Sequence, residues 1–201
     1  MTQAVHGEGH DRSRDTRSRL RELALQLFAE QGYEKTSLRE IAERLGVTKA
    51  ALYYYFKSKE DIVASLIEDY VAELDELISW GQQQPQTAKT RAEIVRRYLH
   101  IVANGTAVFR MLHQNQAAVS GLAAAKKRGE LFRERMDALT GLLTGPDAQL
   151  REQIRAASCV MSLSFCCMHF QDRGASPAEL ETALLDVALE LVGATPANVS
   201  A

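Results

Sequence analysis

The sequence has few cysteines, few prolines and no long apolar run, and each shortage excludes a class of protein. Its three cysteines, Cys159, Cys166 and Cys167, are too close together for the spaced framework of a secreted disulfide scaffold. Four prolines and twelve glycines in 201 residues are too few for a collagen-like or low-complexity chain. No uncharged stretch reaches the ~20 apolar residues of a membrane-spanning helix. We therefore expect an ordinary globular protein that does not span a membrane.

Residues 1–14 are polar and charged, and they lack the apolar core of a signal peptide. Together with the cysteine usage, this favours the cytoplasm. The motifs H-E-x-x-H and G-x-S-x-G and the glycine-rich phosphate loops are missing, and the five histidines form no recognisable constellation. We therefore expect no enzymatic activity, no cofactor and no bound metal, although a helical enzyme remains a third alternative.

Charge is distributed unevenly along the chain, although the net charge is only -2. Residues 12–59 carry eleven Lys and Arg against six Asp and Glu, whereas residues 60–201 carry thirteen against eighteen. A basic front and an acidic rear indicate that the front meets a polyanion.

Apolar residues recur with the helical period through the whole sequence, and no convincing strand occurs. Glycines and prolines punctuate this pattern, and Asn104-Gly105 reads as a break between two helices. We predict an all-α fold of about nine helices, over residues 20–31, 37–45, 48–55, 58–80, 88–104, 106–119, 122–143, 147–171 and 177–192.

Two of the short front helices meet the requirements of a helix-turn-helix. Ser37 and Glu40 have the spacing of a capping box, and Gly46 breaks the first helix within a tight turn. Thr48 is placed to cap the second helix and to present its N-terminus outward, where free N–H groups suit phosphate. Lys49 can donate to a guanine edge or a phosphate, and small neighbours such as Ala50 allow close approach to bases.

Aromatic residues follow directly, and we assign Phe56 to the core. Successive helical residues point ~100° apart, so at least one of Tyr53, Tyr54 and Tyr55 must face outward, where a hydroxyl can bond a phosphate. Lys57 and Lys59 lie just beyond, and Arg12, Arg14, Arg17 and Arg19 form a basic N-terminal segment.

Residues 20–70 resemble the DNA-binding domain of the TetR/AcrR family of transcriptional regulators. The resemblance is carried by Phe28 with Gly32-Tyr33, Thr36-Ser37, Ile41-Ala42, Leu45-Gly46-Val47, Leu52-Tyr53, Tyr55-Phe56 and Lys59.

This resemblance implies an all-α homodimer that binds a palindromic double-stranded DNA operator, usually as a repressor, and is released by a small molecule bound in its rear domain. It implies base-reading roles for Arg39, Thr48, Lys49 and Ala50. It implies contacts to the DNA backbone from Ser37, Tyr53, Tyr54, Tyr55 and Lys59. We expect a flexible basic arm (1–14), a helix-turn-helix DNA-binding domain (15–60), a ligand-binding and dimerisation domain (61–193) and a loose tail (194–201).

The last two predicted helices are apolar around much of their circumference, so each needs burial on two sides. One side can cover the domain's own core, and the other can pack on a second copy as a four-helix bundle. The predicted dimer interface is Leu180, Leu184, Val187 and Leu191, the alternative being a monomer with a thick core.

A sensing pocket is expected among residues 60–171, with a small apolar or aromatic effector. Its candidate lining is Trp80, Tyr98, Phe109, Met111, His113, Phe132, Met136, Met161, Phe165 and His169, although each of these residue types is more often core than ligand contact. The alternative is a metal- or redox-responsive regulator that uses Cys159, Cys166, Cys167 and His169.

Overall fold

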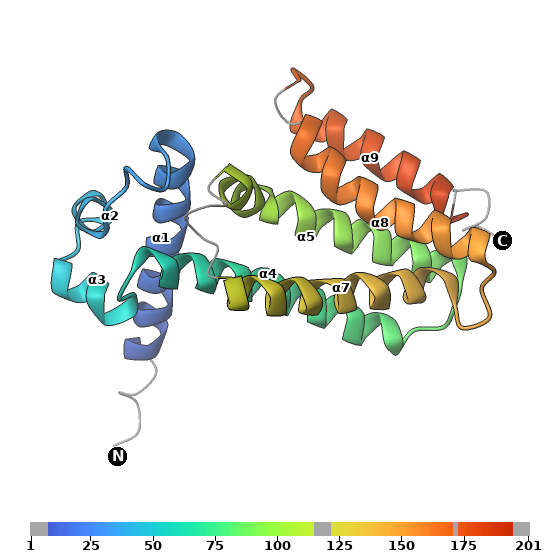
Figure 1. Cartoon of the computed structure of the whole chain (residues 1–201), viewed down its shortest axis with the longest axis horizontal. Coiled ribbons are helices and arrows are strands. Elements are labelled where there is room, and N and C mark those ends of the chain that lie inside the picture. The colour runs from blue at the N-terminus through green and yellow to red at the C-terminus, as the bar shows by residue number, and fades with distance from the viewer. Residues whose placement is uncertain (1–7, 115–121, 171–172, 195–201) are drawn as a thin grey trace, which may run out of the picture. The chain divides into compact units, whose positions relative to one another are not determined.

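A computed structural model describes residues 8–114, 122–170 and 173–194, with the backbone alone at 8–14, 109, 112–114, 122–129 and 131. Within these ranges all regular structure is α-helical, and the eight helices are close to the predicted nine (Figure 1). None of the described helices combines the length and apolar character needed to cross a membrane. The helices are α1 (Glu8–Gln31), α2 (Leu38–Leu45), α3 (Lys49–Tyr55), α4 (Lys59–Gln82), α5 (Ala88–Gln114), α7 (Leu122–Thr144), α8 (Leu150–Phe170) and α9 (Pro177–Leu191).

The chain divides into two compact units. Unit 1 comprises residues 1–68 and 107–119, and unit 2 comprises residues 69–106 and 120–201. Two of the three boundaries, after residues 68 and 106, fall inside long helices, so α4 and α5 each contribute to both units.

Unit 1 is built around an apolar core that joins α1, α2 and α3 to the first part of α4. Helical spacing places Leu20, Ala24 and Leu27 on the buried face of α1, because side chains three and four residues apart share a face. The core is completed by Phe28, Tyr33, Ile41, Ala42, Leu52, Phe56, Ile62, Val63 and Met111.

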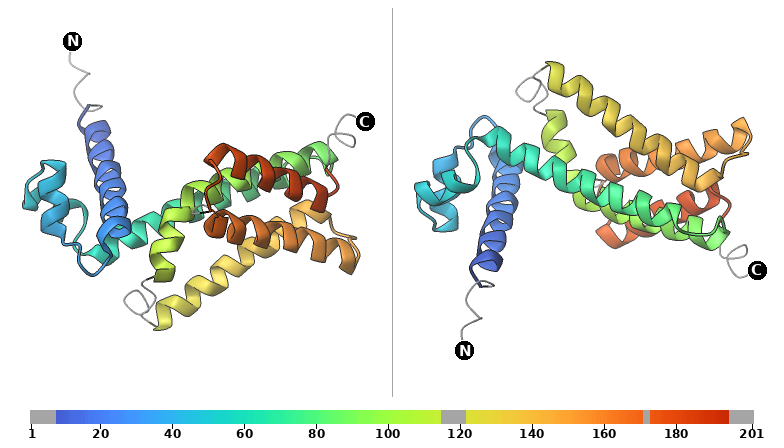
Figure 2. Two further views of the ribbon diagram at one scale, coloured as in Figure 1. Left: turned by 90° about the horizontal axis from the view of Figure 1, so that it is seen from above. Right: turned by 90° about the horizontal axis from the view of Figure 1, so that it is seen from below.

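Unit 2 is a bundle in which α8 packs against both α7 and α9 (Figure 2). α8 buries a stripe on one face, and the last helix buries Ala188 and Leu189. Ser176 and Glu179 form a capping box at the start of α9, where each side chain accepts from the other's backbone N–H. The buried stripe of α8 is Ala156, Cys159, Val160, Leu163 and Cys167.

The turn between α2 and α3 is formed by local backbone and side-chain hydrogen bonds. Ser37 Oγ accepts from the N–H of Glu40 at 3.1 Å, and Thr48 Oγ1 accepts from the N–H of Ala51 at 3.1 Å. Between them, Gly46 has a φ of 74°, a left-handed conformation that glycine adopts without a side-chain clash. The N–H of Val47 donates to the carbonyl of Ala42 at 3.0 Å, which closes the end of α2.

A second set of contacts attaches the start of α4 to the turn after α1. Lys59 Nζ donates to the carbonyl of Tyr33 at 2.7 Å and to that of Glu34 at 3.4 Å, and it lies 4.4 Å from the centre of the Tyr33 ring. The Tyr33 hydroxyl donates to Glu60 Oε1 at 2.7 Å, and this hydrogen bond lowers the pKa of the Glu60 carboxyl. We call Tyr33, Lys59 and Glu60 the α4 brace.

Two helices differ from the sequence prediction. The chain does not break at Asn104-Gly105, because α5 continues to Gln114. Gly105 is buried and the Thr106 hydroxyl donates to the carbonyl of Val102 at 2.8 Å, so packing and a local hydrogen bond outweigh the ~1 kcal/mol cost of a helical glycine. α1 begins at Glu8, so residues 8–14, predicted as part of a flexible arm, are helical. Acidic residues near the start favour this, because they complement the positive end of the helix dipole.

Replacing Gly46 with Ala should destabilise unit 1 by roughly 1–2 kcal/mol, because alanine resists the left-handed conformation. Gly141→Ala is the matched control: Gly141 lies inside α7 with open space around its missing Cβ, so alanine should stabilise by about 0.5–1 kcal/mol. Urea unfolding followed by circular dichroism measures both. Equal effects of the same sign would contradict the turn geometry.

Replacing Lys59 with Met keeps the length of the side chain and removes the ammonium. We expect a loss of roughly 1–3 kcal/mol of stability, because two carbonyls lose a charged donor. Lys57→Met should change stability by less than about 0.5 kcal/mol, because Lys57 is exposed. Thermal melts of the unmodified protein, Lys59→Met and Lys57→Met measure the loss of stability. Identical melting temperatures would show that the α4 brace contributes nothing.

Candidate nucleic-acid interface

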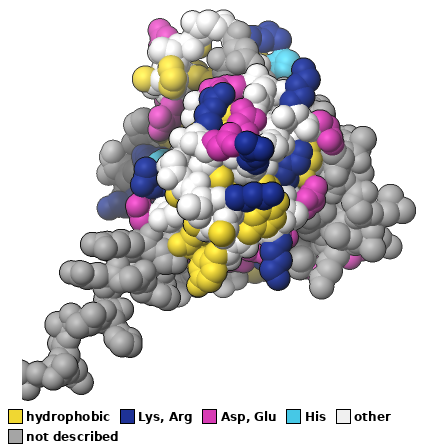
Figure 3. Space-filling model, turned by 90° about the vertical axis from the view of Figure 1, so that its left-hand side faces the viewer, with side chains coloured by type: hydrophobic (Ala, Val, Ile, Leu, Met, Phe, Trp, Pro, Cys, Tyr) yellow, Lys and Arg dark blue, Asp and Glu magenta, His cyan; other side chains and the backbone are white. Residues whose placement is uncertain are grey.

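The leading end of α3 is exposed. Thr48, Lys49 and Ala50 are exposed, as predicted for an N-terminus that faces outward. Figure 3, which faces the side of the molecule that carries α2 and α3, shows basic side chains placed among apolar and acidic ones. A capped helix with small side chains at its exposed start has the shape that fits a major groove, which is ~12 Å wide.

The aromatic run at the end of α3 divides between surface and core. Tyr54 is 81% exposed and Tyr53 is 42% exposed, which confirms that at least one tyrosine points outward. The Lys49 ammonium lies 5.4 Å from the centre of the Tyr53 ring. Tyr55 is half-buried against the core, and Phe56 is buried as predicted.

The candidates on α2 and α4 are held by contacts within the protein. The Ser37 hydroxyl is exposed, and its oxygen is used by the cap of α2. Arg39 Nε donates to Glu43 Oε1 at 2.7 Å, so this ion pair occupies one of the five N–H donors of the exposed guanidinium. Lys59 has two of its three N–H donors committed to the α4 brace.

Two arginines of α1 have contacts that the sequence analysis did not identify. The Arg17 guanidinium lies 5.3 Å from the centre of the Phe56 ring, which places α1 next to the end of α3. Arg21 Nη1 donates to the buried Ser65 Oγ at 3.2 Å and adds a second attachment between α1 and α4. The only sign of the Arg21–Ser65 contact in the sequence is that Ser65 stands within an otherwise apolar stretch of α4.

The predicted lining of the sensing pocket does not converge on one cavity. Tyr98 and Met136 are brought together: the Tyr98 hydroxyl lies 3.5 Å from Met136 Sδ and 2.6 Å from Ser164 Oγ. Burial raises the pKa of Tyr98 to about 12. Met111 belongs instead to the core of unit 1.

The remaining candidates lie elsewhere. Trp80 stacks under the Arg97 guanidinium, 3.8 Å away, in a cleft of about 570 Å³ between α4 and α5. Phe132 is exposed on α7, and Met161, Phe165 and His169 are exposed on α8. The side chains of Phe109 and His113 lie outside the part that the structure describes.

The cysteines give the metal or redox alternative no support. Burial raises the pKa of Cys159 to about 12, the reverse of the lowered pKa that makes a thiol reactive. Cys167 is buried, with its sulfur 3.5 Å from the Thr106 hydroxyl. Among the described residues, no group of three or more His, Cys, Asp or Glu side chains is arranged to hold a metal ion.

An apolar strip on α8 and α9 is exposed, and we call it the α8–α9 strip. On α9 it includes Val187, which is 55% exposed, whereas its neighbour Ala188 is buried. Leu180, Leu184 and Leu191, predicted to lie beside Val187, are half-buried. On α8 the strip comprises Leu150, Ile154, Met161 and Phe165.

Comparison with known proteins agrees with this geometry. Residues 20–66 match the family model of bacterial regulatory proteins of the tetR family. A fatty acid metabolism regulator protein of Bacillus subtilis is 29% identical over 60% of this chain and 62% of its own length. The transcriptional repressor KstR2 of Mycolicibacterium smegmatis is 38% identical over 38% of this chain and 36% of its own. The matches thus span less than two thirds of these relatives.

Solved structures show the same fold over nearly the whole chain. A transcriptional regulator from Aquifex aeolicus superposes with a TM-score of 0.68 at 20% identity, covering 88% of this chain and 99% of that one. FadR from Bacillus subtilis, solved in complex with stearoyl-CoA, superposes with a TM-score of 0.60 at 22% identity, covering 87% and 96%. Residues 20–66 therefore match the helix-turn-helix domain of the tetR family of bacterial regulatory proteins, and the chain as a whole shares the helical fold of these solved transcriptional regulators.

Proposed function

We propose that this protein represses transcription by binding a palindromic operator as a homodimer, and that a small apolar or aromatic effector releases it. The observation that carries the proposal is the outward-facing, capped start of α3 in unit 1. That arrangement leaves backbone N–H groups, a lysine and small side chains free to approach a base-pair edge.

The contacts with DNA divide by chemistry. Thr48, Lys49 and Ala50 at the start of α3 read bases, and Arg39 joins them through the donors that Glu43 does not occupy. The second group binds the phosphate backbone and fixes the register without reading sequence. It comprises Ser37, Tyr53, Tyr54, Tyr55 and the remaining donor of Lys59.

Dimerisation would cover the α8–α9 strip. Its exposed side chains come from two neighbouring helices, so two copies related by a two-fold axis can form a four-helix bundle. The same symmetry explains a palindromic operator. Two recognition helices can enter successive major grooves when they lie ~34–36 Å apart.

The effector would act on unit 2. The relatives include a FadR solved with stearoyl-CoA and a KstR2 described as a ketosteroid regulator, and both names point to molecules with large apolar bodies. In this chain, Arg135 of α7 donates two hydrogen bonds to Asp75 of α4, at 2.8 and 2.7 Å. A ligand that moves α7 therefore also pulls α4, and a coupling of ~1–3 kcal/mol changes DNA affinity 5–150-fold.

Selection of bound DNA from a random pool tests the proposal. We expect a palindromic consensus whose half-sites are one helical turn apart, with binding that weakens as salt increases. Enrichment of no sequence at physiological salt would contradict it.

Replacing Lys49 with Ala should relax base preference at one or two positions of each half-site, at a cost of roughly 1–3 kcal/mol per lost contact. Lys35→Ala is the control, because Lys35 is exposed in unit 1 outside α2 and α3. The selection is repeated with each variant. An unchanged consensus with Lys49→Ala would show that this lysine does not read bases.

Replacing Val187 with Asp should weaken the dimer by more than about tenfold, because two-fold symmetry places one new carboxylate from each copy at the interface. Thr182→Asp is the control: Thr182 is exposed on α9 but lies about 140° around the helix from Val187. Size-exclusion chromatography with light scattering reports the mass across a dilution series. If both variants remain dimeric at the same concentration, the interface lies elsewhere.

A further inference from the structure

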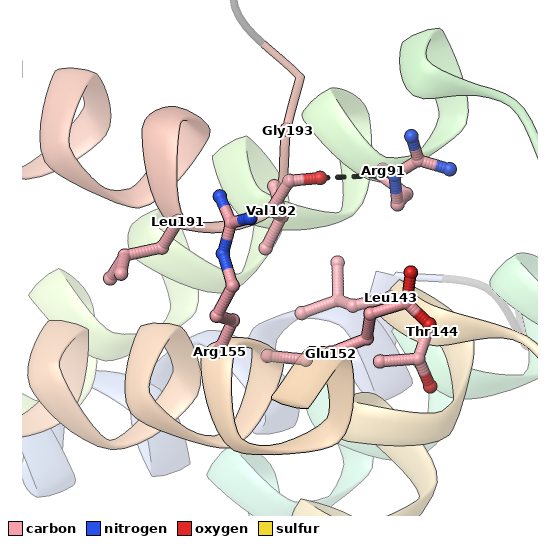
Figure 4. A pocket seen from close by; sticks show the side chains of 9 residues that line it. Arg91, Leu143, Thr144, Glu152, Arg155, Leu191, Val192 and Gly193 are labelled. Carbon is pink, nitrogen blue, oxygen red and sulfur yellow. Dashed lines mark hydrogen bonds between the residues drawn. The ribbon is translucent and has the colours of Figure 1, made fainter. Parts of the chain in front are cut away.

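One end of unit 2 holds a cleft of about 260 Å³ where four helices meet (Figure 4). Its lining combines apolar side chains with three charged ones, Arg91, Glu152 and Arg155. The lining residues are Arg91 from α5, Leu143 and Thr144 from α7, Glu152, Arg155 and Ala156 from α8, and Leu191, Val192 and Gly193 from the end of α9.

Two guanidinium groups flank the last turn of α9 in this cleft. Arg91 Nε donates to the carbonyl of Val192 at 3.2 Å, and Arg155 Nη2 donates to the carbonyl of Glu190 at 2.8 Å. A guanidinium has five N–H donors, so each arginine keeps donors beyond its helix-capping bond. Glu152 also lines the cleft, and its carboxylate accepts from the backbone N–H of Gln149 at 3.0 Å. The charged side chains of the cleft therefore sum to a net positive charge.

An apolar crevice continues from this cleft into the bundle. Leu143 lines both, and Ile94 and Cys159 lie one helical turn beyond Arg91 and Arg155. The crevice contains no space for a water molecule, so it is closed by its own side chains. Its lining is Ile94, Val95, Tyr98, Leu139, Leu143, Cys159, Val160 and Leu163.

The inner end of the crevice is marked by Tyr98, whose hydroxyl pairs with Ser164. Seven residues of α5 separate Arg91 from Tyr98, which corresponds to a rise of about 10 Å. The cleft is therefore cationic and the crevice beyond it apolar, and the crevice is long enough for a medium-length chain once its leucines are displaced.

We propose that the effector is an amphipathic anion, whose carboxylate or phosphate ester is held by Arg91 and Arg155 and whose apolar chain lies in the crevice. Guanidinium groups bind both kinds of anion with paired hydrogen bonds, which defines the class of head group. This inference rests on the proposed function, because it names the chemistry and the position of the effector.

The position of the crevice also explains how binding acts on α4. A chain that enters must displace Leu139 and Leu143, which both lie on α7. Arg135 lies one turn before Leu139 on the same helix and holds Asp75 of α4. Displacement of α7 by the chain therefore reaches α4 through this ion pair.

Titration calorimetry with three probes of one chain length tests the head-group preference. Decanoate and decyl phosphate carry the anion, and decanol is the neutral control. We expect at least one anion to bind more than about tenfold tighter than decanol. The tighter binder of the two anions shows whether the natural head group is a carboxylate or a phosphate ester. Equal binding of all three, or no binding of any, would overturn the inference.

The double variant Arg91→Gln with Arg155→Gln keeps a donor for each α9 carbonyl and removes both charges. It should lose the preference for the anion while retaining decanol binding and its melting temperature. Arg96→Gln is the control, because Arg96 is on α5 but lines the other cleft. NMR contacts between the decanoate chain and the methyl groups of Leu143 and Val160 place the chain independently of stability. Contacts confined to exposed methyl groups would contradict the crevice.

Release of the selected operator by a bound effector, measured as loss of DNA binding, separates this inference from the function on which it rests. If an operator is selected and only neutral effectors release it, the anion site is wrong and the proposed function stands. If no operator is selected, the proposed function fails, and the calorimetric comparison of decanoate with decanol still decides whether the anion site exists.

Discussion

The attachment of α4 within each of the two units is the constraint on which the rest of the structure depends. In unit 1, the Lys59 ammonium holds the carbonyls that follow α1, and Glu60 holds the Tyr33 hydroxyl. In unit 2, the Asp75 carboxylate is held by Arg135 of α7. Between these attachments runs an unbroken helix, whose backbone hydrogen bonds resist stretching.

The helix-turn-helix could be predicted from the sequence because its determinants are local. Ser37, Gly46 and Thr48 act on backbone groups within four residues of themselves, so their spacing alone indicates where α2 ends and α3 begins. Locality also explains the wrong prediction at Asn104-Gly105. Those two residues favour a turn in isolation, but a buried glycine and the Thr106 hydroxyl continue the helix once its neighbours are packed around it.

The proposed sensing region could not be predicted in the same way, because its contacts join residues far apart in the chain. Tyr98 meets Ser164 across 66 positions, and Arg91 meets Val192 across 101. Residue type did not separate members of the core from members of a site: Met111 is apolar like the rest, yet it completes unit 1. Lys59 shows the same limit, since a lysine in a basic motif has the same sequence signal whether it braces a helix or binds a phosphate.

In the proposed mechanism, the closed crevice sets the energetic condition for release from DNA. A form in which Leu139 and Leu143 fill the crevice cannot hold an apolar chain, so the effector must favour the form in which α7 has moved. This difference in affinity between two states is what any ligand-driven shift requires. Each buried methylene group of the chain contributes about 0.8 kcal/mol. Some of these groups only offset the cost of moving Leu139 and Leu143 apart. Two or three further methylene groups are then enough for a coupling of ~1–3 kcal/mol. Chain length, rather than head-group charge, should therefore set the strength of release, while the arginines at the opening set which molecules bind.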